Sequence, residues 1–123
     1  MCFILLKTDM KVREILQTIE GEVLCGHDYL DLEVEYACAS DLMSDVLTVK
    51  TRNSILITGL CNVQSVRTAE MSDFRVILYV RDRHIDPEMI AVAQDNDMVI
   101  LRTPYSMFKT TGCLYTAGLK PVY

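Results

Sequence analysis

The sequence lacks the long hydrophobic run that a membrane span or a secretory signal peptide requires. Its N-terminal run, CFILL, has only five apolar residues, whereas a transmembrane helix needs about 20. Internal repeats, low-complexity runs and linkers are missing as well. We therefore expect a cytoplasmic protein with no membrane partner.

Motifs for phosphate and metal chemistry are also missing. Nothing fits GxxxxGK[ST] or GxGxxG, whose glycines let backbone amides hold phosphates. There is no CxxC pair, and the nearest substitute is Cys25-Gly26-His27. The five cysteines are an odd number, which favours free thiols in a reducing compartment. We expect no metal and no cofactor.

Catalytic machinery is equally scarce. A serine or cysteine nucleophile needs a base such as histidine beside it, and the two histidines, His27 and His84, both lie in polar loop segments. A solvated surface role is the simpler interpretation of each. We predict no catalytic residues and a protein that is not an enzyme.

The composition fits one packed domain. With 123 residues, of which 50% are hydrophobic, the chain has ample material for a single core. Its formal charge of -5 repels a nucleic-acid backbone on average, and we expect no nucleic-acid partner. Met10 opens a segment that reads like a natural start, so we assign residues 1–9 to an extension or edge segment and residues 10–123 to one domain. Thr8 or Asp9 could cap the helix that follows.

Alternating strand and helix patterns fill the rest of the chain. Apolar residues at helical spacing predict an amphipathic helix from Lys11 to Ile19, ended by Gly21. Asn62 can cap a second helix, and Asp86 before Pro87 begins a third. The last helix, Ser106 to Leu119, should turn Phe108, Cys113 or Leu114, and Ala117 inward. The expected strands are Glu22–Cys25, Val34–Ala39, Ser54–Thr58, Phe74–Val80 and Met98–Leu101.

This alternation predicts an α/β fold, three-layered and Rossmann-like, with a mainly parallel sheet of about five strands and helices on both faces. In such sheets ligands bind beyond the carboxyl ends of the strands, so the segments that follow the strands should gather on one rim. The candidate ligand-binding residues on that rim are Ser40, Asp41, Asp45, Thr58, Asn62, Arg81, Arg102, Thr103 and Ser106. The RDRH segment, Arg81 to His84, would supply an anion or nucleotide contact there.

The segment SDLMSDVL, Ser40 to Leu47, has three interpretations. Ser40 or Asp41 could cap a helix, with the next carboxylate favoured by the helix dipole. Asp41 and Asp45 could instead share a helix face and hold Mg²⁺ or act as acid and base. As a third alternative, the apolar residues of the segment would form an interface with a partner: Leu42, Met43, Val46 and Leu47. Local sequence physics favours the cap.

Taken in order, the motifs resemble the small stand-alone proteins of the DRTGG-domain family. The resemblance runs from Met10 to Leu119 and is most specific in SDLMSDVL and in TPYSMF with the G-LY-AGL ending that follows it. The family's name-giving motif ends in Thr-Gly-Gly, and Tyr79-Val80-Arg81 stands in the corresponding place.

The resemblance implies a compact α/β domain, similar to the N-terminal domain of HPr kinase and to domains of phosphotransacetylases and CBS-domain pyrophosphatases. In those proteins the domain is an accessory part implicated in dimerisation and regulation. We therefore expect a non-enzymatic regulatory or scaffolding module, a homodimer that uses part of Leu42–Leu47, with a partner protein as a further option. The alternative is a sensor of a nucleotide or another small anion at the rim.

Overall fold

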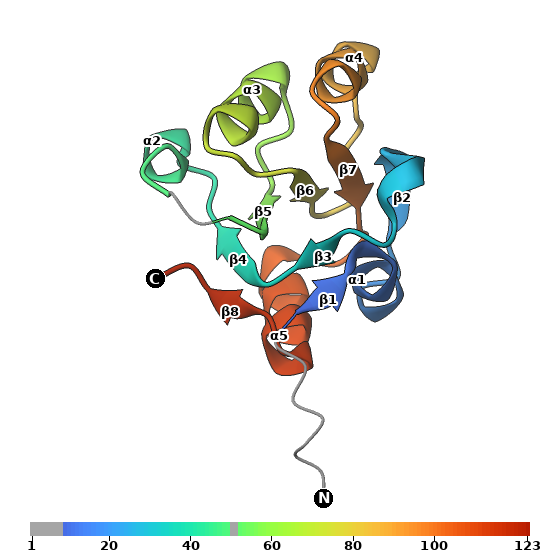
Figure 1. Ribbon diagram of the computed structural model, residues 1–123, viewed down its shortest axis with the longest axis vertical. Coiled ribbons are helices and arrows are strands. Elements are labelled where there is room, and N and C mark those ends of the chain that lie inside the picture. The colour runs from blue at the N-terminus through green and yellow to red at the C-terminus, as the bar shows by residue number, and fades with distance from the viewer. Residues whose placement is uncertain (1–8, 50–51) are drawn as a thin grey trace, which may run out of the picture.

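A computed structural model describes residues 9–49 and 52–123 of the chain. The elements alternate as the sequence predicts, with short connections between them (Figure 1). In chain order they are β1 (Met10–Lys11), α1 (Val12–Thr18), β2 (Glu22–Cys25), the 3-10 turn η2 (His27–Tyr29), β3 (Glu33–Val34), β4 (Tyr36–Ala39), α2 (Met43–Val46), β5 (Ser54–Thr58), α3 (Val63–Met71), β6 (Val76–Tyr79), α4 (Pro87–Asp95), β7 (Val99–Arg102), α5 (Met107–Ala117) and β8 (Lys120–Pro121).

The main sheet has six strands in the order β2-β7-β6-β5-β4-β8. Strands β8, β4, β5, β6 and β7 run parallel, and only β2 is antiparallel to its neighbour. Helices α2, α3 and α4 cover one face, and α1 and α5 cover the other (Figure 1). The predicted α/β class with a mainly parallel, doubly covered sheet is confirmed. A two-residue ribbon of β1 and β3 is separate from this sheet.

Burial on both faces explains the near-continuous apolar strands. All five residues of β5 and all four of β6 are buried. Alternate side chains enter different clusters, since Ile55 and Ile57 pack in the cluster with α1 and α5, while Leu56 packs in the cluster with α2, α3 and α4. Each such side chain contributes about 1.5–3 kcal/mol of transfer free energy.

The topology places the functional loops. From β4 to β7 the chain moves one strand at a time, and it crosses through α2, α3 and α4 on the same face. After β7 it turns to the other face, where α5 carries it back to β8 beside β4. The loops after β6 and β7 therefore leave toward opposite faces of the sheet.

Several expected boundaries shift in the structure. The predicted strand Phe74–Val80 is shorter, Val76–Tyr79, and Val34–Ala39 is divided between β3 and β4. Asp9 does not cap α1: the N-cap residue is Lys11, whose backbone N–H donates to the Glu14 carboxylate at 2.9 Å. The other proposed cap, Thr8, lies outside the described residues.

The described ranges contain neither a membrane-spanning helix nor a disulfide bond. None of the helices there has the length and apolar character needed to cross a membrane. Cys25, Cys38, Cys61 and Cys113 are all free thiols, as the sequence suggests for them, and Cys2 lies outside the described residues.

Gly26 provides a test of the fold, because it occupies a left-handed conformation with φ of 88° against the edge of β7. A Cβ there would lie 2.9 Å from the Val99 Cα. We expect Gly26→Ala to lower the free energy of unfolding by about 2–4 kcal/mol, from left-handed strain and overpacking together. Gly112→Ala is the control, because its Cβ would meet no atom within 4 Å, and it should stabilise helix α5 by up to about 1 kcal/mol. Urea unfolding measures both, and equal effects would contradict the expected clash.

Candidate functional site

Four polar segments lie at one edge of the sheet, which we call the rim. They follow the carboxyl ends of the parallel strands β4, β5, β6 and β7. They are Ser40–Asp45, Thr58–Gln64, Arg81–His84 and Arg102–Ser106, and they contain all the candidate ligand-binding residues named from the sequence. The side chains of these segments differ in what they bind, as the following contacts show.

Asp41 joins the ends of two strands and does not cap a helix. Its Oδ1 accepts hydrogen bonds from the Gly59 backbone N–H at 2.7 Å and from the Thr58 hydroxyl at 2.9 Å. The cap interpretation is wrong for Asp41, because the single-turn helix α2 begins after Leu42. Ser40 accepts a hydrogen bond from the Leu42 N–H at 3.0 Å, so it shapes the turn that precedes α2.

The contacts of Asp41 also set its charge state. The Gly59 N–H stabilises the carboxylate most and lowers the Asp41 pKa below its usual value, and partial burial opposes this. The Thr58 hydroxyl and the positive charges of Arg81 and Arg83 lower the pKa further. Asp41 therefore stays ionised at neutral pH, close to two guanidinium groups.

Asp41 and Asp45 do not share a helix face, because Asp41 precedes α2 and Asp45 lies within it. The charge of Asp45 acts instead on Cys38, where it raises the thiol pKa in addition to the larger effect of burial. The Asp41 carboxylate is directed to Gly59 and Thr58, so the two acids serve different neighbours. In residues 9–49 and 52–123, His, Cys, Asp and Glu side chains form no group of three that could hold a metal.

The crevice where such sheets usually bind ligands is closed. It should open between β6 and β7, whose following loops diverge to opposite faces. Here the Arg81 N–H donates to the Tyr105 carbonyl at 2.9 Å, and the Asp82 N–H donates to the Thr103 carbonyl at 2.8 Å. These hydrogen bonds tie the two loops together.

The Arg102 side chain also closes this crevice, and one of its partners, Glu22, belongs to β2. Its guanidinium forms ion pairs with Glu22 and Asp82 and donates to the Arg83 carbonyl at 3.1 Å. With three partners and a side chain only 23% exposed, Arg102 holds the rim together and has little capacity left for a ligand.

Four other candidate ligand residues hold the backbone. Thr58 and Thr103 are fully buried, and the Thr103 hydroxyl donates to the Ile19 carbonyl at 2.7 Å. Asn62 caps α3, as predicted, by accepting from Ser65 N–H at 2.9 Å. Ser106 caps α5 in the same way. All of these side chains lie at the rim but have structural partners.

Arg81 and Arg83 remain exposed at the rim. Arg81 has φ of 64° and Asp82 has φ of 53°, and this left-handed turn directs the Arg81 side chain over Gly59. Its Nη2 lies 3.1 Å from the position that a Cβ on Gly59 would take. In the resemblance described above, Arg81 stands where the family motif has its last glycine. Arg81 keeps the positive φ that glycine adopts readily, and it adds a guanidinium group at that position. Arg83 was not among our candidates, although the RDRH segment contains it.

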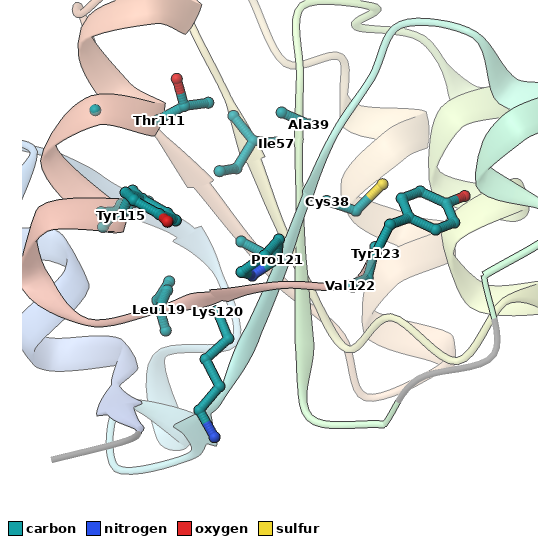
Figure 2. A pocket seen from close by; sticks show the side chains of 13 residues that line it. Cys38, Ala39, Ile57, Thr111, Tyr115, Leu119, Lys120, Pro121, Val122 and Tyr123 are labelled. Atoms are coloured by element: carbon teal, nitrogen blue, oxygen red, sulfur yellow. The ribbon is translucent and has the colours of Figure 1, made fainter.

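Away from the rim, a groove that the sequence did not predict lies beside helix α5. It measures about 440 Å³ and lies between α5, the β4 edge and the C-terminal segment (Figure 2). Its lining is mainly apolar. Figure 2 shows Tyr115 and Leu119 on one side, Ile57 at the centre, and Cys38 and Tyr123 opposite.

We missed the groove because we assigned the wrong face of α5 to the core. The buried residues of α5 are Thr110 and Leu114. Of these, only Leu114 was predicted to point inward. Phe108 was expected inside but is 89% exposed, and Ala117 is also exposed. Phe108, Gly112 and Tyr115 recur at helical spacing and share an outer face with Thr111. This helix carries apolar residues all round, so periodicity could not tell which face packs on the sheet.

The segment Leu42–Leu47 is only partly available as a surface. Leu42 and Leu47 are exposed, whereas Met43 packs partly against the core and Val46, the last residue of α2, is completely buried. Val46 therefore cannot belong to the interface that we expected from the sequence. Near this segment, the Thr48 hydroxyl lies 3.2 Å from the Tyr123 hydroxyl, which connects α2 to the groove.

The fold and its rim define a three-layer α/β domain. Residues 14–117 match the DRTGG domain, and the chain therefore belongs to the DRTGG domain family. It is structurally similar to the CBS and DRTGG domains of the regulatory region of Clostridium perfringens pyrophosphatase, solved with the activator diadenosine tetraphosphate. The TM-score is 0.71 at 13% identity, over 85% of this chain and 45% of the other. This likeness shows the fold, and the chain spans less than half of that structure. None of the curated protein sequences matches the chain.

Asp41→Ala tests the junction between β4 and β5. It leaves the Gly59 N–H and the Thr58 hydroxyl without their acceptor, so we expect the free energy of unfolding to fall by about 1–3 kcal/mol at pH 7. Asp45→Ala removes an exposed acid of the same segment and should change stability by no more than about 0.5 kcal/mol. Urea unfolding compares the two variants, and similar losses would contradict the assigned role of Asp41.

Asp41→Asn separates the charge from the hydrogen bonds. Because the folded-state pKa is lowered, the charge contributes stability above the unfolded pKa of about 3.9. That contribution is lost as the pH falls through the folded-state pKa. We expect the stability of the unmodified protein to decline more steeply below about pH 5 than that of Asp41→Asn. Thermal unfolding from pH 2 to pH 7 measures this, and equal acid slopes would refute it.

Proposed function

We propose that the chain is a non-enzymatic regulatory module that works as a homodimer. Its family and its structural similarity to part of a pyrophosphatase regulatory region support the regulatory role. The rim supports it as well, because its polar side chains are mostly engaged in holding the backbone. Catalysis, where it is needed, would then belong to another domain or another protein.

The exposed aromatic face of α5 carries the dimer proposal. Phe108 is 89% exposed and Tyr115 is 70% exposed, and aromatic rings at such positions typically become buried at interfaces. Gly112 lies between them with open space where a side chain would be. A partner helix could approach closely at that point.

The surface around α5 has both protruding aromatic side chains and an apolar groove beside them. A two-fold interface places the same patch on both subunits, so the patch must be complementary to itself. The aromatic side chains of α5 supply the projections, and the apolar groove beside them supplies the hollow. The charged group in its lining, Lys120, forms an ion pair with Glu35 at 3.0 Å and extends away from the other lining side chains (Figure 2).

The neighbouring sheet edge is protected from strand pairing. The Lys120 N–H, in β8, donates to the Glu35 carbonyl just before β4 at 3.0 Å, and the Val122 N–H, just after β8, donates to the Ala37 carbonyl of β4 at 3.2 Å. The residue between them, Pro121, has no N–H to offer on the outer side. A partner would therefore contact side chains of α5 and the groove, and would not extend the sheet.

A double substitution, Phe108→Ser with Tyr115→Ser, tests the dimer. Each ring is a candidate hot spot worth about 2 kcal/mol, so the dimer dissociation constant should rise at least about 30-fold. Met71→Ser is the matched control, because this side chain is 65% exposed on α3, on the opposite face of the sheet. It should leave the dissociation constant unchanged, and Leu42→Ser tests the α2 surface in the same way.

Sedimentation equilibrium over a range of protein concentrations gives the dissociation constants. A strictly monomeric parent protein at micromolar concentration would refute the homodimer. Dissociation by Leu42→Ser but not by the α5 variant would move the interface to α2. Circular dichroism checks that each variant is folded.

A further inference from the structure

In the ranges that the structure describes, Arg81 and Arg83 at the rim lie near one carboxylate, Asp41, but neither is in ion-pair contact with it. Arg81 and Arg83 are exposed, and neither guanidinium forms an ion pair or a hydrogen bond with residues 9–49 or 52–123. Arg81 lies over Gly59. The Cys61 thiol donates to the His84 carbonyl at 3.1 Å, so the backbone next to Arg83 lies against the loop between β5 and α3. Arg81 and Arg83 therefore both adjoin that loop, and the positive charge of each lowers the Asp41 pKa.

Acidic side chains around the pair are directed elsewhere. Asp82 and Glu22 bind Arg102, and Asp86 lies 3.3 Å from His84. Asp41 is the carboxylate whose pKa both arginines lower, and its Oδ1 is already bound by the Thr58 hydroxyl and the Gly59 N–H. An anion at this place would meet two guanidinium groups and one partly engaged carboxylate.

The amino end of α3 faces the same loop. Asn62 caps this nine-residue helix by accepting from the Ser65 N–H, and the helix geometry leaves the N–H groups of Val63 and Gln64 without intrahelical acceptors. Such groups favour oxyanions, as does the positive end of the helix dipole. The helix end adds to the arginine pair and would not make a site without it.

Gly59 keeps the space above the loop open. A Cβ at this position would lie 3.1 Å from the Arg81 guanidinium and 3.6 Å from Asp41 Oδ2. A larger side chain would displace Arg81 from the strand end. The bare backbone at Gly59 and the left-handed turn at Arg81 together bring the guanidinium to the end of β5.

We infer that Arg81 and Arg83, together with the amino end of α3, bind the phosphoryl group of a small molecule above the β5–α3 loop. A tetrahedral oxyanion presents oxygens in several directions, which suits two guanidinium groups and backbone N–H donors at once. Asp41 opposes the ligand charge and thus lowers the affinity. The site is independent of the proposed dimer, because α3 and α5 cover opposite faces of the sheet.

Calorimetric titration with inorganic phosphate tests this site, with the ionic strength held constant by sodium chloride. We expect saturable binding to the parent protein and at least a tenfold loss in the double variant Arg81→Gln with Arg83→Gln. The double variant Arg13→Gln with Arg52→Gln removes the same charge from exposed positions on α1 and before the start of β5, and it should bind as the parent does. Equal losses in both variants would show a general charge effect and overturn the site.

Asp41→Asn should change the phosphate affinity in the opposite direction to the arginine variants. It removes the repelling charge and keeps an oxygen acceptor for Gly59 and Thr58, so phosphate should bind severalfold more tightly. Arg83→Gln alone should bind severalfold more weakly, which covers the case in which the double variant does not fold. Unchanged or weaker binding in Asp41→Asn, or no binding to the folded parent at millimolar phosphate, would overturn the inference. Sedimentation of the same samples shows separately whether the dimer persists.

Discussion

Burial of β5, β6 and β7 on both faces is the constraint on which the rest of the structure depends. These strands bury nearly every side chain, so apolar cover is needed above and below the sheet. The chain supplies that cover with α2, α3 and α4 on one face and with α1 and α5 on the other. Polar chemistry is thereby confined to the ends of the strands.

Backbone groups at the strand ends still need partners, and polar side chains provide them. Asp41 satisfies Gly59 at the end of β5, and Thr103 satisfies the carbonyl of Ile19 after α1. Asn62 and Ser106 do the same for the first turns of α3 and α5. A polar residue after a buried strand is thus a structural requirement first, which explains why most of our candidate ligands have structural partners.

The sequence predicted correctly those features that depend on neighbouring residues in the chain. Strand β5 has the bounds that its apolar run predicts, and Asn62 caps α3 as its position suggests. Two features could not be predicted in this way. The partner of Asp41 is a backbone N–H 18 positions later in the chain, so the segment alone favours a cap. The outward face of α5 is aromatic, so its hydrophobic period does not identify the side that meets the sheet.

Strand β5 connects the two surfaces that we propose. Ile57 lines the groove, Thr58 donates to Asp41, and Gly59 lies beneath Arg81. A regulatory module needs an energetic link between ligand and partner, and such a link needs an element with two arrangements. Strand β5 is fully buried and held by ladders on both sides, so it cannot shift easily. The partly exposed loop after Gly59 and the single-turn helix α2 have fewer restraints, so we expect any coupling between rim and groove to pass through them.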